Sequence, residues 1–489
     1  MLLEPGTTCW RRDRADRAAL IIDMADYYDA AMAAMRQASR SIHFLNWAFE
    51  PQTPFHPRPG GETRPEDCIA EFLKTLADGN RKLDVRVLCW KSAMPVAATQ
   101  NFFPLLDRKD FEGSRVKFVL DGKLPRGACH HQKMLVIDDV VAFCGGGDIG
   151  PDRWDTVQHL DDDPRRRMKP GKPACYPSRH EVMGLVQGAP AQVLGELFRE
   201  RWLRATGEIL PAPATPAKPH WPAAIPPGLA GVNVGFSRTM AAWRGAPETA
   251  EVLALHLDSI AQATRCIYME NQYFTAPAIS QALARRLAER DGPEVILIGA
   301  EHSPSYFDQV TMDRTRSRFL QRLMDADRHG RFRAYSGVTS LGRTMIVHAK
   351  LTIIDDRLLR IGSANLNNRS MGFDTECDMS FEAAGPGAAR HRAEIAALRT
   401  RLAAHWLGCG EALVEDAIRQ HDGLGAGLEA LRLAGHTRLR PIAPQPLGPV
   451  TGLIAGYHLG DPAGPGDSWR PWRRPAAIAR QARGKATGG

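Results

Sequence analysis

The sequence has no uninterrupted apolar run of about 18 residues, the length that a membrane-spanning helix needs. Its first residues lack a basic region, an apolar core and a cleavage site, so we expect no secretory signal. The nine cysteines include no Cys-x-x-Cys pair, which excludes the common zinc and redox motifs and favours a reducing compartment. We therefore expect a cytoplasmic protein whose contact with a membrane is peripheral.

Lysine is scarce, with twelve residues in 489, although Lys and Arg together number 63 against 55 Asp and Glu. The formal net charge of +8 suits a phosphate-bearing partner, either a lipid surface or a nucleic acid, and does not choose between them. The contents of 44% hydrophobic and 24% charged residues are typical of a globular protein. The length predicts roughly two to four compact units.

The order of predicted elements occurs twice along the chain. A helix at 25–38 leads into an apolar strand at 41–47, and a helix at 251–263 leads into a strand at 266–271. The next strands correspond in the same order, 84–89 and 116–120 to 294–298 and 332–335. We predict an α/β fold of two duplicated lobes with pseudo-twofold symmetry, largely parallel sheets with antiparallel last strands, and an active site between the lobes.

We predict four segments: an N-terminal lobe at 1–210, a Pro-rich linker at 211–244, a C-terminal lobe at 245–410, and a helical segment with a Pro/Gly/Arg-rich tail at 411–489. The linker is predicted from the dense prolines between Pro211 and Pro227. The tail carries Trp469 and Trp472 among arginines. It is interpreted either as a contact for anionic lipid head groups or as a solvated, disordered end.

The pattern His-x-Lys-x-x-x-x-Asp occurs at equivalent places in the two halves. Its residues are His131, Lys133, Asp138, His348, Lys350 and Asp355. Chance would give about 0.03 matches in a chain of this composition, so two matches are not accidental. Because residues i and i+2 of a strand share a face, each His and its Lys are expected to project together. Symmetric packing of the lobes would bring both pairs to one pocket.

Such a pocket holds two ammonium groups for the oxygens of a phosphate and two imidazoles on either side of its phosphorus. One imidazole can attack phosphorus while the other protonates the departing oxygen. The lysines supply the positive charge that stabilises the transition state. We therefore expect neither a metal ion nor another cofactor.

A second predicted phosphate-binding element follows each motif, Gly-Gly-Gly-Asp in the first half and Gly-Ser-Ala-Asn in the second. Gly146 permits close approach of the backbone, and Ser363 and Asn365 can donate hydrogen bonds to phosphate oxygens. Asp148 stands where the second half has Asn365. Because a carboxylate repels phosphate, we expect Asp148 to hydrogen-bond structurally.

Each imidazole also needs an acceptor on its other ring nitrogen. Glu181 and Glu376, downstream in the two halves, are candidates that the sequence alone does not separate from other carboxylates. His130 would face away from the pocket. The lone histidine His159 is interpreted as structural.

The double motif resembles that of the phospholipase D superfamily. The segments 267–274 and 362–371, together with Arg153-Trp154-Asp155, are similar to segments of phosphatidylcholine-type phospholipases D. The resemblance covers roughly residues 5 to 410. It implies that His131 forms a covalent phosphohistidine, and that His348 protonates the leaving alcohol and then activates water or another alcohol.

The resemblance also implies roles for the remaining candidates. Lys133, Lys350 and Asn365 would bind the phosphoryl oxygens. Glu181 and Glu376 would orient the histidines, whereas the two motif aspartates would tie loops beneath the pocket.

The implied activity is cleavage of glycerophospholipids to phosphatidate, with transfer to alcohols. A cardiolipin synthase-like phosphatidyl transfer is an alternative, against which the lack of N-terminal apolar spans argues. A metal-independent nuclease is another, although such nucleases are often single-motif chains that dimerise, whereas two motifs here make a monomer sufficient. The intact His and Lys of both halves argue against a non-catalytic scaffold.

Overall fold

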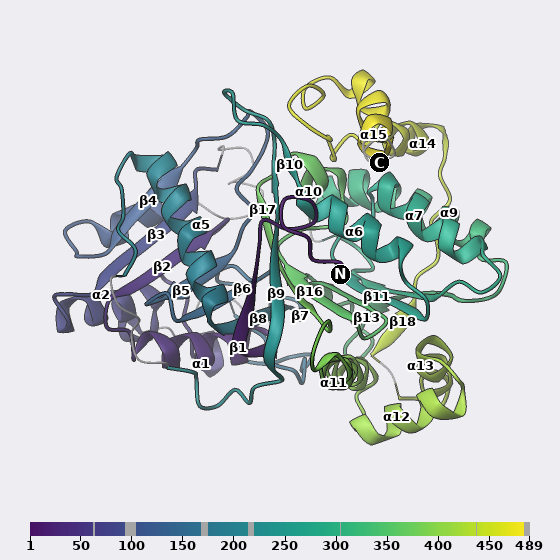
Figure 1. The fold of residues 1–489 in the computed structure, drawn as a ribbon, viewed down its shortest axis with the longest axis horizontal. Coiled ribbons are helices and arrows are strands. Elements are labelled where there is room, and N and C mark those ends of the chain that lie inside the picture. Colours follow the sequence, from purple (N-terminus) through teal and green to yellow (C-terminus); the bar gives the residue numbers. More distant parts are fainter. Residues whose placement is uncertain are drawn as a thin grey trace.

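Two lobes of similar architecture lie side by side in the computed structural model (Figure 1). The structure describes residues 1–489 except 62–63, 93–103, 168–174, 214–219, 304, 437 and 484–489. In Figure 1 the N-terminal lobe is purple to blue and the C-terminal lobe is green, with β1 and β9 adjacent between them (Arg11–Ile22 and Leu229–Met240). None of the described helices is both long and apolar enough to cross a bilayer.

The described elements of the N-terminal lobe alternate between strand and helix as far as β4, after which four more strands precede the last helix. Its strands are β1 Arg11–Ile22, β2 Ser41–Asn46, β3 Asp84–Trp90, β4 Lys117–Asp121, β5 Met134–Ile137, β6 Val141–Gly145, β7 Arg179–His180 and β8 Val182–Gly188. Its helices are α1 Met24–Met35, α2 Ile69–Gly79, α4 Pro104–Asp107 and α5 Ala189–Thr206, with short turns η1 Pro59–Gly61, η2 Pro65–Asp67 and η3 Arg108–Phe111.

The C-terminal lobe repeats this order. Its strands are β9 Leu229–Met240, β10 Thr249–Ala250, β11 Cys266–Asn271, β12 Glu294–Gly299, β13 Phe332–Gly337, β14 Ile346–Val347, β15 Lys350–Ile354, β16 Leu358–Gly362 and β17 Glu376–Glu382. Its helices are α6 Glu251–Ala261, α7 Pro277–Ala288, α8 Tyr306–Asp308, α9 Arg314–Ala326, α10 Asn368–Gly372 and α11 Ala388–Leu407, with the turn η4 Gln309–Asp313.

One sheet runs through both lobes and demonstrates the duplication. From β1 outward the N-terminal lobe has the order β1-β8-β6-β5-β2-β3-β4, and from β9 the C-terminal lobe has β9-β17-β16-β15-β11-β12-β13. In both lobes the three outer strands are parallel and the inner ones antiparallel. The antiparallel pair β1–β9 joins the halves. The predicted duplicated α/β fold is confirmed.

The central strands are apolar because both of their faces are covered. In β5, Val136 belongs to the same hydrophobic cluster as Phe198 of α5, whereas Leu135 and Ile137 belong to that of α1. The helices therefore cover opposite faces, and successive side chains alternate between two cores. This leaves the ends of the strands, rather than their faces, for chemistry.

The range 211–244, predicted as a linker, is only partly a connection. Its second half forms β9, which pairs antiparallel with both β1 and β17. The prolines that indicate a linker end at Pro227, and the strand begins two residues later. The many prolines before residue 228 led us to predict a linker where the chain forms a central strand of the sheet.

The C-terminal segment folds against the C-terminal lobe. It contains α12 Glu411–Gln420, α13 Leu424–Leu433, β18 Leu439–Pro441, α14 Pro449–Gly456, η5 Pro471–Arg473 and α15 Arg474–Arg483. Strand β18 extends the sheet beside β13, and buried Asp461 accepts hydrogen bonds from Asn368 N at 3.0 Å and Thr275 Oγ1 at 2.8 Å. A disordered tail is therefore wrong up to residue 483, while 484–489 lie outside the described residues. Trp469 and Trp472 stay 73% and 68% exposed.

Candidate active site

Each motif histidine enters its strand while it is bonded to the opposite lobe. The backbone N–H of His131 donates to Thr375 O at 2.9 Å, and that of His348 donates to His180 O at 2.9 Å. The parallel pair β7–β14 forms a small sheet between the lobes at the second contact. Both histidines lie just before β5 and β15 rather than within these strands. Each His–Lys pair is therefore located where the chain enters the strand.

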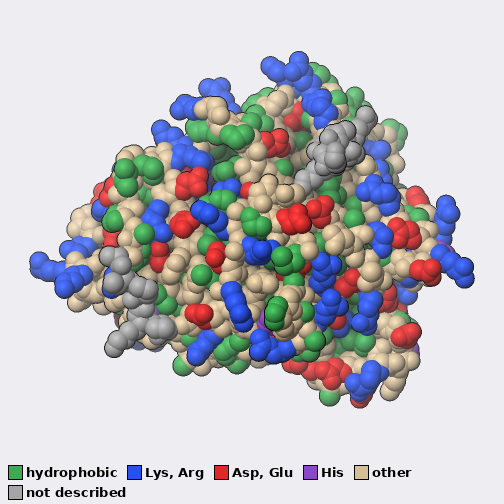
Figure 2. All heavy atoms as spheres, viewed as in Figure 1, with side chains coloured by type: hydrophobic (Ala, Val, Ile, Leu, Met, Phe, Trp, Pro, Cys, Tyr) green, Lys and Arg blue, Asp and Glu red, His purple; other side chains and the backbone are tan. Residues whose placement is uncertain are grey.

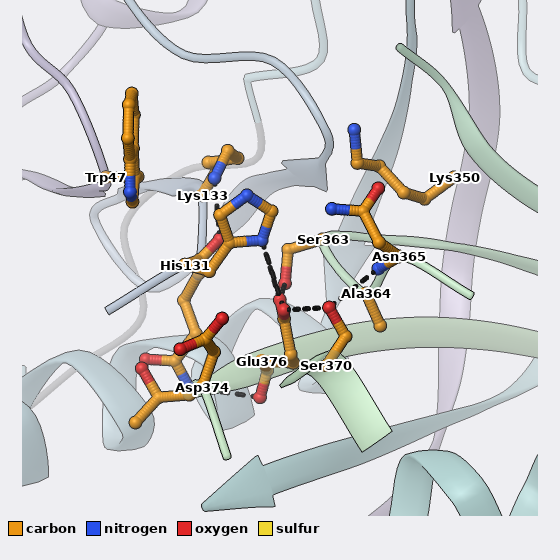
Figure 3. Close-up of polar contacts among 12 residues, drawn as sticks. Trp47, His131, Lys133, Lys350, Ser363, Ala364, Asn365, Ser370, Asp374 and Glu376 are labelled. Carbon is orange, nitrogen blue, oxygen red and sulfur yellow. Dashed lines mark hydrogen bonds and ion pairs between the residues drawn. The ribbon is translucent and has the colours of Figure 1, made fainter. Parts of the chain in front are cut away.

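The carboxylate partners of the imidazoles also cross between the lobes. His131 Nδ1 lies 3.1 Å from both carboxylate oxygens of Glu376, which belongs to the C-terminal lobe. Ser363 Oγ and Ser370 Oγ donate to the same carboxylate at 2.5 and 2.6 Å (Figure 3). His348 Nδ1 lies 2.5 Å from Glu181 Oε2 of the N-terminal lobe. Each Nε2 is therefore left to face the pocket.

Both imidazoles line a single cavity of about 770 Å³. Their side chains are mostly buried, with 14% exposed for His131 and 11% for His348. Asn365 lines the same cavity, as do the guanidinium-bearing residues Arg153 and Arg179. The two distant motifs thus converge on one positively charged space.

The lysines lie beneath the histidines. Lys133 and Lys350 are 0% and 3% exposed, and each ammonium group donates to the backbone carbonyl of its own motif histidine, at 2.7 and 2.5 Å. Lys133 Nζ is also 3.4 Å from Asp148 Oδ2. Figure 3 shows the two amines on either side of the His131 ring and the Asn365 side chain.

Burial and the clustered cations control the protonation of the site. Burial, followed by Lys133 and Lys350, holds the pKa of His131 well below its usual range, and burial with Lys350 does the same for His348. Burial raises the pKa of Glu181 to about 7 and that of Glu376 to about 8. Burial, with Lys133 nearby, lowers the pKa of Lys350 to about 7. An anion bound in the cavity would favour the charged forms of these bases.

Two residues of the predicted phosphate-binding elements face elsewhere. Ser363 Oγ is fully buried and donates to Glu376, so it is not aimed at a phosphate. Gly146 packs against the Glu181 carboxylate, and an added Cβ would lie 2.4 Å from its Oε1. Neither residue lines the cavity, so their contact with substrate stays a prediction that these two carboxylate contacts do not favour. Asn365 does line the cavity.

Asp148 has the structural role expected of it. Its Oδ1 accepts the backbone N–H groups of Trp47 and Ala48 at 3.1 and 3.0 Å, at the end of β2. Its remaining oxygen faces the ammonium group of Lys133. The carboxylate therefore holds the first lysine and the loop after β2, and Asp148 also lines the cavity, where its contact with substrate stays a prediction.

The motif aspartates lie at the far ends of β5 and β15 from the cavity. Asp138 accepts the backbone N–H groups of Ser39, Arg40 and Ser41, each at 2.8 Å. Asp355 receives the corresponding groups of the residues before β11 at 2.6 to 2.9 Å. Both occupy positive-φ positions at the start of three-residue hairpin loops. They tie loops and do not touch reacting atoms.

Several cavity residues were not predicted from the sequence. The aromatic and apolar part of the wall is formed by Trp47, Trp90, Leu124, Phe307 and Trp469. The strand that ends before Trp47 and the strand that ends before Gln272 are the equivalent first parallel strands of the two lobes. Since the carboxyl ends of parallel strands meet at one edge of a sheet, this equivalence was the available signal.

The geometry can be compared with known proteins. A family model described as "Cardiolipin synthase, PLD-like domain" matches residues 257–398. "Phospholipase D A" of Dictyostelium discoideum is 24% identical over 425 residues, which is 74% of this chain and 32% of that protein. The chain belongs to the phospholipase D superfamily.

Other similar proteins are described by different reactions. "Cardiolipin synthase A" of Pseudomonas putida (strain W619) is 28% identical over 251 residues, 50% of this chain and 43% of that protein. The chain thus spans about a third to under a half of the length of these curated relatives. The structure of phosphatidylserine synthase from Haemophilus influenzae Rd KW20 shares the fold, with a TM-score of 0.54 and 15% identity over 87% of this chain and 96% of that one.

Proposed function

We propose that the protein is a phospholipase D-type phosphodiesterase that cleaves the head group of glycerophospholipids through a phosphohistidine. The observation that carries the proposal is the pair of imidazoles in one cavity, each with its Nδ1 against a carboxylate of the opposite lobe. The carboxylates fix each ring and leave Nε2 for the substrate. A nucleophile and a general acid thus face one phosphorus atom.

In the first step, His131 Nε2 attacks the phosphorus of the phosphodiester. The P–N bond forms while the bond between phosphorus and the head-group oxygen breaks, and His348 transfers the Nε2 proton to that oxygen. The lowered pKa of His131 supports this role because it favours the unprotonated form of the attacking nitrogen. The pKa of His348 is lowered as well, so its role as the acid requires the negative charge of the bound phosphodiester to favour the protonated imidazole. The buried Lys133 and Lys350 stabilise the charge that gathers on the phosphoryl oxygens.

In the second step, His348 Nε2 removes a proton from water, and the hydroxide attacks phosphorus as the P–N bond breaks. Phosphatidate leaves and His131 regains its lone pair. An alcohol in place of water gives the transfer product. The 2.5 Å contact with Glu181 supports the cycle because the carboxylate stabilises the imidazolium formed in this step.

The walls of the cavity support a lipid substrate. Trp47, Trp90 and Phe307 supply apolar surface beside Arg153 and Arg179, which suits a molecule with a phosphate and a hydrocarbon part. Trp469 lies at the same cavity and is largely exposed, so it can contact the membrane surface that presents the lipid. On the face drawn in Figure 2, basic side chains are interspersed with acidic ones and form no continuous basic band.

The experiment supplies the purified chain, in EDTA, with vesicles of phosphatidylcholine, vesicles of phosphatidylglycerol, or duplex DNA. We expect release of choline with formation of phosphatidate, and phosphatidylethanol instead when ethanol is added. His131→Ala measures the background. DNA fragmentation without lipid cleavage, or lipid turnover that requires an added divalent ion, would overturn the proposal.

A cardiolipin synthase-like transfer is the second candidate, favoured by the description of the matched family model. It uses the same phosphohistidine, with phosphatidylglycerol as both donor and acceptor. Formation of cardiolipin and glycerol from phosphatidylglycerol, with no choline released from phosphatidylcholine, would select it.

A further inference from the structure

A second cluster of titratable side chains lies at the lobe interface, next to Glu181 in sequence but outside the catalytic cavity. Asp23, His159 and His180 come from the N-terminal lobe, and His405 comes from α11 of the C-terminal lobe. One nitrogen or oxygen atom from each lies within 4.8 Å of the other three. The first three residues are at most 1% exposed, so this is not a solvated group of surface charges.

The spacing of these atoms is that of ligands around one ion. His159 Nε2 lies 3.2 Å from Asp23 Oδ2 and 3.3 Å from His405 Nε2, and His180 Nδ1 lies 3.1 Å from Asp23 Oδ1. In a tetrahedral site with bonds of about 2.0–2.1 Å, neighbouring ligand atoms are separated by about 3.3 Å. Two separations match this value, 3.2 Å between Asp23 Oδ2 and His159 Nε2 and 3.3 Å between His159 Nε2 and His405 Nε2, and all four ligand atoms lie within 4.8 Å of one another.

Two inward-facing atoms contact only other members of the cluster. Among the described residues, Asp23 Oδ2 and His180 Nδ1 make no hydrogen bond of good geometry, and they lie 3.2 Å from His159 Nε2 and 3.1 Å from Asp23 Oδ1, respectively. The outward atoms are satisfied, since His159 Nδ1 lies 2.9 Å from Asp155 Oδ2 and His180 Nε2 lies 2.8 Å from Glu270 Oε2. A carboxylate behind an imidazole fixes the tautomer that leaves the other nitrogen free for a metal. Buried polar atoms without partners are rare and indicate a missing ligand.

The charge of the cluster points the same way. Three buried carboxylates, Asp23, Asp155 and Glu270, surround the imidazoles. Arg166, which lies 3.6 Å from Asp155, is the guanidinium ion-paired with them. With neutral imidazoles the cluster carries an excess of negative charge, which either a divalent cation or protons on the histidines must offset.

One side of the cluster meets a surface cavity. His405 lies in the wall of a separate surface cavity of about 560 Å³, formed with Asp26, Val157 and Arg438. Asp23, His159 and His180 do not line this cavity, so His405 is the ligand that meets it, on a side separate from the catalytic cavity.

We propose that Asp23, His159, His180 and His405 bind one divalent transition-metal ion of the zinc class as a structural cross-link between the lobes. Three imidazoles and one carboxylate form a four-coordinate set that zinc prefers. Asp23 also accepts the backbone N–H of Glu181 at 3.0 Å and donates its own N–H to Glu181 O at 2.8 Å. The ion thus positions the carboxylate partner of His348 and does not touch the substrate.

From the sequence we expect that the reaction needs no metal ion. The proposed zinc site is separate from the catalytic cavity, so it does not bear on that prediction. The four ligands are scattered from residue 23 to residue 405, so no spacing motif announces them.

The test is metal analysis of the full chain, expressed with added zinc and then dialysed. We expect about one zinc per chain in the wild type and below about 0.2 in His405→Gln and in Asp23→Asn. His391→Gln is the matched control, because His391 lies on the same helix and contacts Ala230 O instead. His131→Ala, a change confined to the catalytic cavity, is expected to keep its zinc. Equal zinc in wild type and His405→Gln would overturn the proposal.

A second measurement separates a folded site from adventitious binding. Dipicolinate treatment is expected to lower the Tm of the wild type by about 3 °C or more, with recovery on addition of zinc, and to leave His405→Gln unchanged. Cobalt is expected to give the visible absorption of a tetrahedral site in wild type and His131→Ala. If the wild type binds neither zinc nor cobalt, protons hold the cluster together and the proposal is wrong.

Discussion

The two lobes hold equivalent imidazole–carboxylate pairs but support the carboxylates differently. Glu376 receives the hydroxyls of Ser363 and Ser370 at 2.5 and 2.6 Å. Among the described residues, the Glu181 carboxylate receives the backbone N–H of Val182 at 3.2 Å and no hydroxyl besides its contact with His348, and Gly146 occupies the position equivalent to Ser363. The duplication has thus kept the pair that faces the substrate and changed what lies behind it.

This difference matches the proposed division of labour. The nucleophile His131 must hold one orientation through the formation of the P–N bond, and a carboxylate fixed by two hydroxyls provides that. His348 gains and loses a proton in each cycle, and Glu181 has fewer fixed donors that would oppose a change of charge. The lobes are therefore interchangeable in fold and distinct in chemistry.

The largest effect is expected from removing the imidazole of either imidazole–carboxylate pair. His131→Ala and His348→Ala are each expected to lower kcat by about 10³-fold or more, because each removes a group used in the transition state. With a p-nitrophenyl phosphodiester, whose leaving group needs no acid, His348→Ala is expected to keep a burst of nitrophenol that His131→Ala lacks. Stopped-flow absorbance measures this burst, and His56→Ala, at a side chain that is 59% exposed, is the control. A burst in His131→Ala alone would reverse the two roles.

A smaller effect is expected from exchanging the residues behind the two carboxylates, Gly146 in the N-terminal lobe and Ser363 in the C-terminal lobe. Gly146→Ser puts a Cβ 2.4 Å from Glu181 Oε1 and 3.0 Å from Lys350 Cδ, so it displaces both. We expect a fall in kcat of about 10²-fold and a loss of about 1–3 kcal/mol in the free energy of unfolding. Ser363→Gly removes one donor from Glu376 and is expected to cost about tenfold or less. Gly79→Ser, which meets nothing within 4 Å, is the control, and denaturant titration with steady-state kinetics measures all three. Equal kcat in Gly146→Ser and wild type would contradict the comparison.

The smallest effect concerns pH. The Ser370 hydroxyl favours the ionised form of Glu376, whose pKa burial raises to about 8. Ser370→Ala is expected to raise that pKa further, and since the carboxylate exists only above its pKa, the acidic limb of kcat/KM moves to higher pH. The pH profile of kcat/KM measures this, and Ser370→Thr, which keeps a hydroxyl, is expected to restore the limb. A limb that moves to lower pH, or that stays in place, would show that Glu376 does not act as a carboxylate.

Most of the fold could be predicted from the sequence. The repeated order of apolar strands located β2, β3 and β4 and their counterparts, because buried parallel strands carry continuous apolar runs. Strand β9 was missed, since its alternating pattern follows a Pro-rich segment. The order of the Pro/Gly-rich tail was missed because buried Asp461 and Asp467 hold it through contacts that no local pattern reveals.

The sequence identified the individual histidines and glutamates of the site but not which glutamate contacts which histidine. The motif spacing named His131 and His348, and position suggested Glu181 and Glu376. It did not show that each glutamate serves the histidine of the other lobe, because that depends on how the halves pack. Ser363 was assigned to the substrate since a hydroxyl after a glycine suits phosphate, yet the nearer carboxylate takes it.

Each lobe supplies the glutamate that contacts the histidine of the other lobe. This arrangement has a consequence for why both halves are encoded in one chain. A slide of one half along the other withdraws both glutamates together, so loosening of the seam along β1 and β9 abolishes activity as a whole rather than by degrees. Half of the polypeptide, however well folded, contains two incomplete dyads. Carrying both halves on one chain guarantees the equal stoichiometry that two separate genes would have to balance.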